Sequence, residues 1–303
     1  MKRFFFLVFF TFSFILSAQI EKKSLLWEIR NPSNNQISYL FGTMHIMDEE
    51  SFFLPKKLLL LLAKSEALCM EINSLNNAEL SPNKLILEKG SFNDIFSEKE
   101  LDTIHQWASE YLLMNDKQFD DNFKNVKPFL VLQFILQNSL PENTKSQESE
   151  LENKAKLKDI ELLGLETIDQ QLKLFDDLTS FEQKNMILDA LRNQDKAKLE
   201  FNELQKLYLL QNLDSLYSFI QKDNSLPNSR IFLEERNIRW ISLMKNMMSK
   251  QKVFFAVGAA HLAGPEGLIE LLIKEGYELN AINYEKANTI SSFSSTNKLF
   301  NLF

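Results

Sequence analysis

Two stretches of this sequence share one pattern: QISYLFGTMH over residues 36–45 and VFFAVGAAH over residues 253–261. Each is a run of mainly aromatic, β-branched and other apolar residues that ends in Gly-x-x-His. Such a run is typical of a buried strand, and glycine lets the chain turn sharply where the strand ends. The two stretches therefore predict two core strands, each of which places a histidine, His45 or His261, just beyond its end.

The segments around each stretch predict the same unit, in which a strand is followed by a loop, a helix and a second strand. In the first unit Pro55 suits the first turn of a helix, and residues 66–72 return as a strand. In the second unit Pro265 opens a helix, and residues 277–282 form the next strand. A hairpin over residues 25–41, with turn residues at its centre, supplies the strand that opens the first unit.

The sequence between the two units is mostly helical. Periodic segments predict helices over residues 97–113, 120–138, 148–157, 168–175, 181–192, 195–220 and 229–248, interrupted by a short apolar strand over residues 161–165. Strand–helix–strand units place parallel strands in one sheet with helices on its faces. The predicted fold class is therefore α/β: a central mixed, largely parallel β-sheet flanked by helices. One predicted domain covers residues 19–290, with a largely helical middle part over residues 93–250.

The N-terminal residues have the pattern of a secretory signal peptide. Lys2 and Arg3 precede an apolar run over residues 4–16, which is too short for an ordinary membrane span, and small residues follow it. We therefore predict a signal peptide over residues 1–18, a periplasmic or secreted protein, and no stable membrane anchor after cleavage. Residues 291–303 form a polar tail to which the sequence assigns no structure.

Charge and cysteine content exclude several classes of partner and site. The formal net charge is −7, and removal of the basic signal peptide makes it more negative, which argues against nucleic acid and anionic membranes as partners. Cys69 is the only cysteine, so an intramolecular disulfide and a metal site of paired thiolates are both excluded. The chain also lacks the His-Glu-x-x-His, Gly-x-Ser-x-Gly, phosphate-loop and dinucleotide-binding motifs.

The residues that follow the predicted strands form the candidate site, because ligands of parallel sheets bind beyond the carboxyl ends of the strands. These residues are His45, Glu71, Glu166 and His261. A single histidine would more often cap a turn or pack on the core, but two in matched positions favour a shared functional site. A neutral imidazole is both a metal ligand and a base near neutral pH. His105, which lacks the glycine motif, is predicted to be structural.

The charged candidates have structural alternatives as well as functional ones. Glu71 follows a buried strand, where a carboxylate must be paired, ligated or at the open strand end. Glu166 could act as a ligand, acid or base, or simply precede a helix whose Thr167 and Gln170 resemble a capping box. Arg236 flanks an apolar helix stripe, where it binds a substrate carboxylate or carbonyl, holds a glutamate, or anchors the helix to the sheet.

These motifs resemble the signatures of the TraB/GumN family, which is related to the Tiki metalloproteases. The resemblance extends over about residues 25–282 and rests mainly on the two histidine motifs. The matching segments are FGTMH at residues 41–45, Glu71 after the early strand, GLET at residues 164–167, ERN at residues 235–237 and VGAAHL at residues 257–262. An acidic signature expected around residues 148–153 is unclear, with Glu150 as the nearest match.

The resemblance implies a central sheet flanked by helices and a site built from both histidine motifs and acidic residues. Tiki-like members are regarded as divalent-metal-dependent proteases. Erythromycin-esterase-like members of the wider group use a histidine and a glutamate to activate water without an obligatory metal. Many GumN-like bacterial members have no established activity.

We therefore expect an exported, metal-dependent hydrolase that acts on peptides. His45, Glu71 and His261 would hold a divalent Mn, Co or Zn ion, with Glu166 as a further ligand or general base and Arg236 stabilising the oxyanion. Two other functions fit the same residues. One is a metal-independent, esterase-like hydrolase with His45 as the base and Glu71 orienting it; the other is a non-catalytic protein that binds a peptide, haem or a metal. The sequence leaves open the metal, the choice between peptide and small-molecule substrates, and the oligomeric state.

Overall fold

The structure is a computed structural model that describes residues 24–73, 81–222 and 229–285. The predicted signal peptide over residues 1–18 and the polar tail over residues 291–303 lie outside these described residues. Within the described ranges, no helix combines the length and the apolar character that crossing a bilayer requires.

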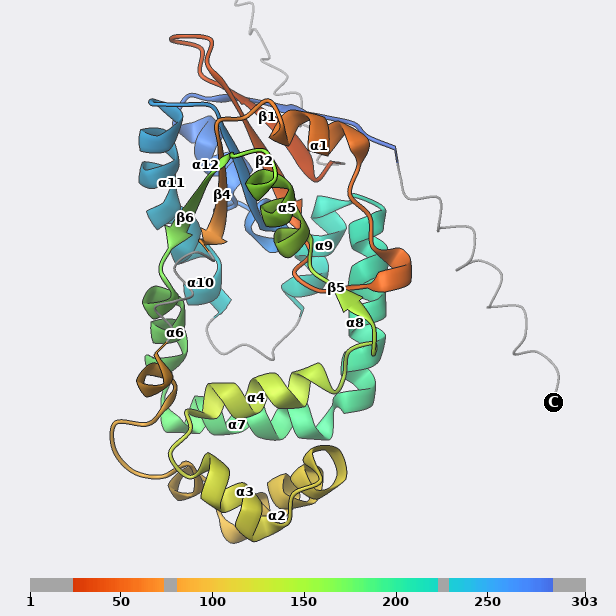
Figure 1. Cartoon of the computed structure of the whole chain (residues 1–303), viewed down its shortest axis with the longest axis vertical. Helices are drawn as coiled ribbons and strands as arrows, with labels where there is room; N and C mark the ends of the chain where they lie inside the picture. The colour runs from red at the N-terminus through yellow and green to blue at the C-terminus, as the bar shows by residue number, and fades with distance from the viewer. Residues whose placement is uncertain (1–23, 74–80, 223–228, 286–303) are drawn as a thin grey trace, which may run out of the picture.

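A six-stranded sheet forms the centre of an α/β fold, as predicted (Figure 1). The strand order is β6-β4-β7-β2-β1-β8. Neighbouring strands are parallel from β6 to β2, whereas β1 is antiparallel to both β2 and β8. The strands are β1 (Leu26–Arg30), β2 (Ile37–Thr43), β4 (Ala67–Ile72), β6 (Glu161–Glu166), β7 (Val253–Gly258) and β8 (Glu278–Ala281).

Both predicted units are present, and the parallel register aligns the ends of their strands. Gly42 of β2 lies opposite Val257 of β7, and Thr43 lies opposite Gly258. On the other side of β7, β4 and β6 end at the same edge, with Ile72 opposite Glu166. The side chains that follow these strands are therefore delivered to one edge of the sheet.

Helices flank the sheet and enclose its apolar strands. Trp27, Phe254 and Phe255 are fully buried in the core between them, and Cys69 is buried there as a free cysteine. Helix α5 contacts β4 and β6, whereas α11 contacts β6 and α12. The helices around the sheet are α1 (Lys56–Leu62), α5 (Gln147–Lys156), α8 (Gln194–Leu209), α9 (Leu213–Ile220), α11 (Glu234–Met248) and α12 (Leu268–Lys274).

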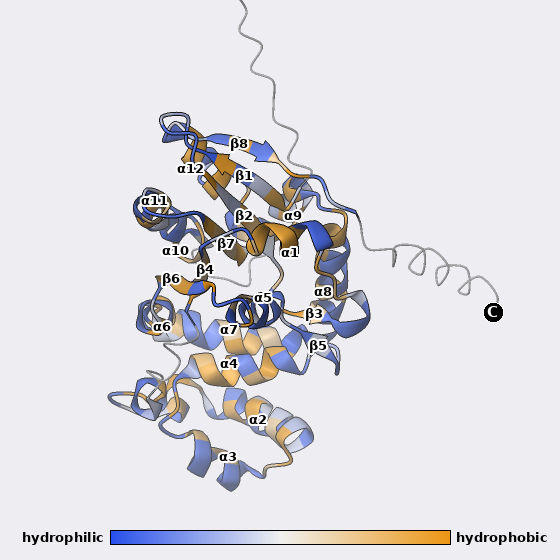
Figure 2. Cartoon of the chain, turned by 45° about the horizontal axis from the view of Figure 1, so that its top comes forward, coloured by the Kyte–Doolittle hydropathy of each residue, from blue (hydrophilic) through white to orange (hydrophobic). Residues whose placement is uncertain are grey.

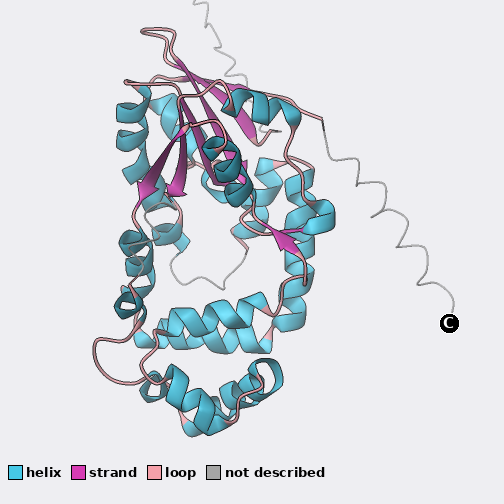
Figure 3. Ribbon diagram, viewed as in Figure 1, coloured by secondary structure: helices cyan, strands magenta, loops and turns pink. Residues whose placement is uncertain are grey.

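A second hydrophobic core lies in a layer of helices that faces the carboxyl edge of the sheet (Figure 1, Figure 3). Its buried side chains include Phe92, Trp107, Phe119, Ile135 and Ile187. Figure 2 shows apolar residues concentrated on the central strands and on α4. The helices of this layer and its link to the sheet are α2 (Glu98–Trp107), α3 (Asp116–Phe123), α4 (Pro128–Gln137), α6 (Ile168–Asp176), α7 (Ser180–Arg192) and the short α10 (Ser229–Phe232).

Several long helices predicted from the sequence are wrong in length because the chain breaks within them. The predicted helix over residues 120–138 is two helices, since Pro128 cannot continue a helix from the preceding turn and instead begins α4. The predicted helix over residues 195–220 breaks at Gln211, which has a φ of 57°. The helix predicted over residues 97–113 has the expected length, because α2 continues into a π-helical turn that ends at Leu113, which has a φ of 55°.

Candidate functional site

The carboxyl end of β2 lies against the loop that follows β7. A Cβ atom on Gly42 would lie 3.0 Å from both the Ala259 Cα atom and the Leu262 Cδ2 atom. A side chain at this position would therefore push the two segments apart. Glycine keeps the two histidine motifs side by side where they leave the sheet.

The first turn of α5 is held beside the end of β2 by a buried glutamine. The Met44 N–H donates to Gln147 Oε1 over 2.9 Å. The Tyr208 hydroxyl lies 2.7 Å from that oxygen and 2.7 Å from the Gly42 carbonyl oxygen, and it donates to one of them. Backbone pairing of β3 (Met47–Asp48) with β5 (Thr144–Lys145) joins the same two segments.

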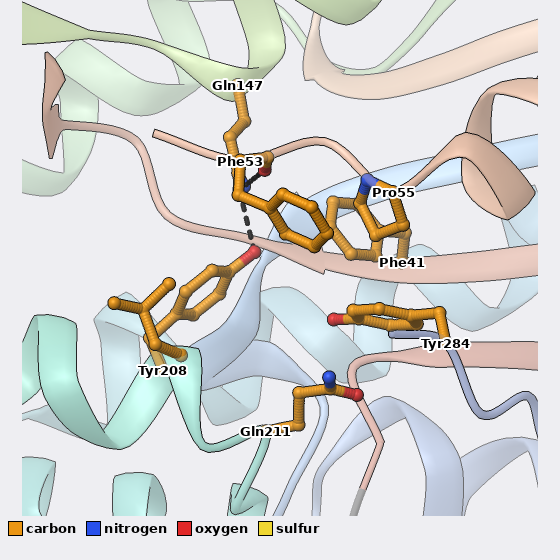
Figure 4. A pocket seen from close by; sticks show the side chains of 8 residues that line it. Phe41, Phe53, Pro55, Gln147, Tyr208, Gln211 and Tyr284 are labelled. Atoms are coloured by element: carbon orange, nitrogen blue, oxygen red, sulfur yellow. Dashed lines mark hydrogen bonds between the residues drawn. The ribbon is translucent and has the colours of Figure 1, made fainter. Parts of the chain in front are cut away.

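Figure 4 shows a pocket that adjoins this contact, with the Tyr208–Gln147 hydrogen bond drawn as a dashed line. The lining is mostly apolar or aromatic and contains none of the predicted site residues. This pocket therefore belongs to the support of α5 and not to the candidate site. The residues that line it are Phe41, Phe53, Pro55, Gln147, Tyr208, Leu209, Gln211 and Tyr284.

His45 lies between two carboxylates and keeps 62% of its side chain exposed. Its Nδ1 atom is 2.7 Å from Glu148 Oε1, and its Nε2 atom is 3.8 Å from Glu71 Oε1. Although desolvation disfavours the charged imidazole, the hydrogen bond and charge of Glu148 and the charge of Glu71 raise the pKa of His45 to about 9. Because the Glu148 carboxylate accepts from Nδ1, Nε2 is the nitrogen that is turned toward Glu71.

Glu148 is a site residue that the sequence did not reveal. Its carboxylate accepts from the Thr43 hydroxyl as well as from His45. Burial favours the neutral carboxyl, but these hydrogen bonds and the His45 charge lower the pKa of Glu148. The available signal was the acidic signature expected near the start of this helix, which the sequence placed at Glu150. That residue instead forms an ion pair with Lys154.

Glu71, at the end of β4, is the buried centre of the site. Its Oε1 atom accepts from the Gly258 N–H at 2.9 Å, and its Oε2 atom accepts from Arg236 Nη2 at 2.5 Å. Burial favours the neutral carboxyl, but the neighbouring imidazoles of His261 and His45, the charge of Arg236 and the hydrogen bond from Gly258 lower the pKa of Glu71 to about 2. Glu71 is therefore a carboxylate at neutral pH.

His261 is buried and neutral, and its hydrogen bonds fix which nitrogen carries the proton. Its Nδ1 atom lies 2.7 Å from Asn237 Oδ1. The Asn237 amide nitrogen donates to the carbonyls of His261 and Glu266, which turns the amide oxygen toward the ring. Nδ1 is therefore the protonated nitrogen and Nε2 the acceptor. Burial, followed by the positive charges of Arg236 and His45, lowers the pKa of His261 to about 3 against the attraction of Glu71.

Arg236 is buried and joins Glu71, Glu166 and His261. Its Nε atom donates to Glu166, and its Nη2 atom contacts both glutamates. Its Nη1 atom donates to the Phe232 carbonyl at 3.1 Å and lies 3.2 Å from His261 Nε2. Each guanidinium nitrogen thus has partners within the protein, and its contacts with Glu71 and Glu166 join α11 to the ends of β4 and β6.

Glu166 precedes a capped helix, which was the structural alternative, and its carboxylate is paired with arginines. The following residue, Thr167, caps α6 in the predicted capping box with Gln170. The Glu166 carboxylate itself is 3% exposed and lies between Arg236 and Arg239. Its oxygens therefore bind two arginines and do not face the His45 imidazole.

The structure thus brings all five predicted site residues into one cluster. Two imidazoles approach the same carboxylate oxygen, because His45 Nε2 lies 3.8 Å and His261 Nε2 lies 3.7 Å from Glu71 Oε1. His105 is elsewhere, in the helical layer, where its Nε2 atom is 2.9 Å from Asp120 Oδ1. The arrangement offers one accessible imidazole, one buried neutral imidazole and an ionised carboxylate between them.

A comparison with protein-family models matches the TraB/PrgY/gumN family over residues 25–281, a range that contains every residue of this cluster. Searches of curated proteins and of solved structures found no match. The match covers most of the chain and both histidine motifs at the edge of the sheet. The chain therefore belongs to the TraB/PrgY/gumN family.

Proposed function

We propose that this chain is an exported hydrolase that cleaves amide or ester bonds, with peptides as the expected substrates, at His45, Glu71 and His261. The observation that carries the proposal is the approach of two imidazole Nε2 atoms to Glu71 Oε1, at 3.8 Å and 3.7 Å. These groups come from distant parts of the chain and meet at the edge where sheets of this kind bind ligands. Two imidazoles around one carboxylate at such an edge suit the activation of water.

The same three groups suit a divalent metal ion, and we propose them as its ligands. Two atoms that each bind one ion at about 2.1 Å lie at most about 4.2 Å apart, and both spacings around Glu71 Oε1 fall within that limit. In the described part of the chain, no group of three or more His, Cys, Asp or Glu side chains is placed so that it could hold a metal ion, so these three side chains would have to move to close on the ion. When bound, Mn, Co or Zn would bring the pKa of a water molecule to about 7.

The remaining residues of the cluster hold these groups in place. Glu148 accepts from Nδ1 of His45 and so keeps Nε2 directed toward Glu71. Glu166 was expected to be a further ligand or a base, but its pairing with two arginines suits a positioning residue better. Arg236 was expected to stabilise an oxyanion; since its nitrogens already have partners, we propose that it acts by holding Glu71 and His261.

One contact favours a metal-independent hydrolase as a second candidate. Arg236 Nη1 lies 3.2 Å from His261 Nε2, so the lone pair that an ion would need is already engaged. In this case the neutral His45 would take a proton from water, and Glu148 would orient it in place of Glu71. Because the pKa of His45 is about 9, such activity would rise with pH up to that value.

Metal removal and restoration tests the proposal. The mature protein would be dialysed against a chelator, its metal content measured, and its activity assayed on a peptide library and on simple esters, with and without Mn, Co or Zn. Cleavage that disappears with the metal and returns with it supports the first candidate. Cleavage by folded, metal-free protein supports the second. Tight peptide binding without any cleavage would instead indicate a binding protein.

A site variant and a control variant, each replacing one histidine, show whether the activity belongs to this site. His45→Ala should abolish cleavage, whereas His105→Ala, in the helical layer, should leave it near the wild-type rate. Equal loss in both variants would contradict the assignment.

Export is tested separately by the N-terminal sequence of the protein recovered outside the cytoplasm, which we expect to begin near Gln19.

A further inference from the structure

The buried nitrogen of His261 already has a partner. With Nδ1 protonated toward Asn237, the ring has one acceptor lone pair, on Nε2. Arg236 Nη1 lies 3.2 Å from that atom. A lone pair in a hydrogen bond cannot bind a metal ion at the same time, so the ion and Arg236 compete for one atom.

Arg236 also supplies the positive charge that an ion would otherwise bring. Its guanidinium lies between the buried carboxylates of Glu71 and Glu166, and it packs over the Trp240 ring at 4.8 Å. Arg239 also reaches Glu166, at 3.3 Å, but its side chain is 49% exposed. Of the two arginines, Arg236 is therefore the one that contacts the proposed ligands.

We propose that Arg236 is the resident cation of the metal-free site, which must release Nε2 of His261 when a metal ion binds there. This inference rests on the proposed metal-dependent function. It makes Arg236 a positioning residue whose contact with His261 and whose charge both oppose metal binding. In the metal-free protein the same residue holds the Glu71 carboxylate through their ion pair.

Zinc titration of the wild-type protein, followed by ¹⁵N NMR of labelled histidine, tests the exchange directly. The chain has three histidines, so single His→Ala variants assign the signals. Without zinc, the His261 Nε2 signal should be that of a hydrogen-bonded acceptor, coupled to an Arg236 N–H. With zinc, it should move to the metal-ligated range and lose that coupling. Zinc binding that leaves the His261 nitrogens unchanged would overturn the inference while keeping a metal site elsewhere in the cluster.

Arg236→Gln and Arg239→Gln form a matched pair, because both remove an arginine from Glu166 and only the first frees His261. Removing a unit charge beside the ion should tighten zinc binding by about tenfold or more in Arg236→Gln, with a larger thermal shift on adding zinc than in wild type. Arg239→Gln should behave as wild type does. Equal zinc affinity in wild type and both variants would overturn the inference.

Two further results separate the inference from the proposed function. If Arg236→Gln binds zinc and wild type does not, Arg236 blocks the site as inferred, but the proposed metal dependence of the natural chain fails. If neither binds zinc, both fail. Should Arg236→Gln not fold without metal, Arg236→Lys keeps the charge with a single nitrogen, and the wild-type NMR titration still decides the outcome.

Discussion

The protonation of individual nitrogens decides what each histidine can do. His45 and His261 follow the same Gly-x-x-His pattern, yet one is exposed beside two carboxylates and the other is buried against an asparagine and an arginine. Their pKa values accordingly shift in opposite directions, to about 9 and about 3. The two motifs therefore supply one imidazole that exchanges protons and one that stays neutral.

Replacing Glu148 should lower the pKa of His45. Glu148→Gln removes the carboxylate that raises that pKa to about 9, so it should fall toward the ordinary 6.5. Since the folded value is the higher one, His45 stabilises the metal-free fold below pH 6.5 and loses that contribution as the pH rises through about 9. Between pH 6.5 and about 9, Glu148→Gln should therefore lose less folding stability than the wild-type protein. NMR titration of His45 measures the shift, and Glu150→Gln on the same helix should leave it unchanged.

Two glycines should separate damage to the site from damage to the fold. A Cβ atom at position 258 would lie 3.1 Å from His45 Nε2 and 3.3 Å from Glu71 Oε1. Gly258→Ala should therefore reduce kcat/KM strongly with a small change in stability. Gly276 has a φ of 88° and open space around it, so Gly276→Ala should cost about 1 kcal/mol of stability and leave activity unchanged. Activity assays and thermal unfolding of both variants provide the measurements, and the reverse pattern would contradict this assignment.

Elements whose pattern is local were predictable, whereas those fixed by distant contacts were not. The apolar strands and the hairpin follow from runs of aromatic and branched residues, and the parallel order of the units placed His45, Glu71 and His261 at one edge. The break at Gln211 has no such signal, since glutamine commonly continues a helix. Glu148 was missed because its role depends on where α5 begins relative to β2, which is set by tertiary hydrogen bonds.

The position of α5 should depend on one hydroxyl of α8. Tyr208→Phe removes the hydroxyl that reaches the Gly42 carbonyl and Gln147 Oε1, and with it a buried hydrogen bond. The expected loss is about 1–3 kcal/mol of stability, with a lower kcat because Glu148 is held less firmly at His45. Urea unfolding measures the first effect and steady-state kinetics the second. Tyr111→Phe, at an exposed tyrosine, should change stability by less than about 0.5 kcal/mol.

The molecule as a whole consists of two structural units joined by a long helical insertion, and the cluster needs all three parts. The first unit supplies His45 and Glu71, the second supplies His261, and the insertion supplies Glu148, Glu166 and Arg236. The helical insertion is therefore part of the site and not an appendage to the sheet. The sequence predicted this convergence for the strand ends but left the contribution of α5 unseen.

Combined substitution of the two histidines should reveal whether the units act as one. If His45 and His261 hold the same ion, either change to alanine removes the same functional group, so the double variant should be hardly slower than a single one. If His45 is instead a base and His261 only orients the substrate, each contributes separately and the losses should multiply, with the base contributing about 10²–10⁴-fold.

The measurement is kcat/KM for wild type, both single variants and the double variant, with metal content determined for each. Near-equal losses, with metal absent from all three variants, would support a shared ion. Losses that multiply while the metal remains bound would rule it out. Thermal unfolding supplies an independent reading, because an ion that binds only the folded chain stabilises it by mass action. Wild type should therefore gain more stability from added metal than either single variant, and an equal gain in all of them would place the ion outside this pair of histidines.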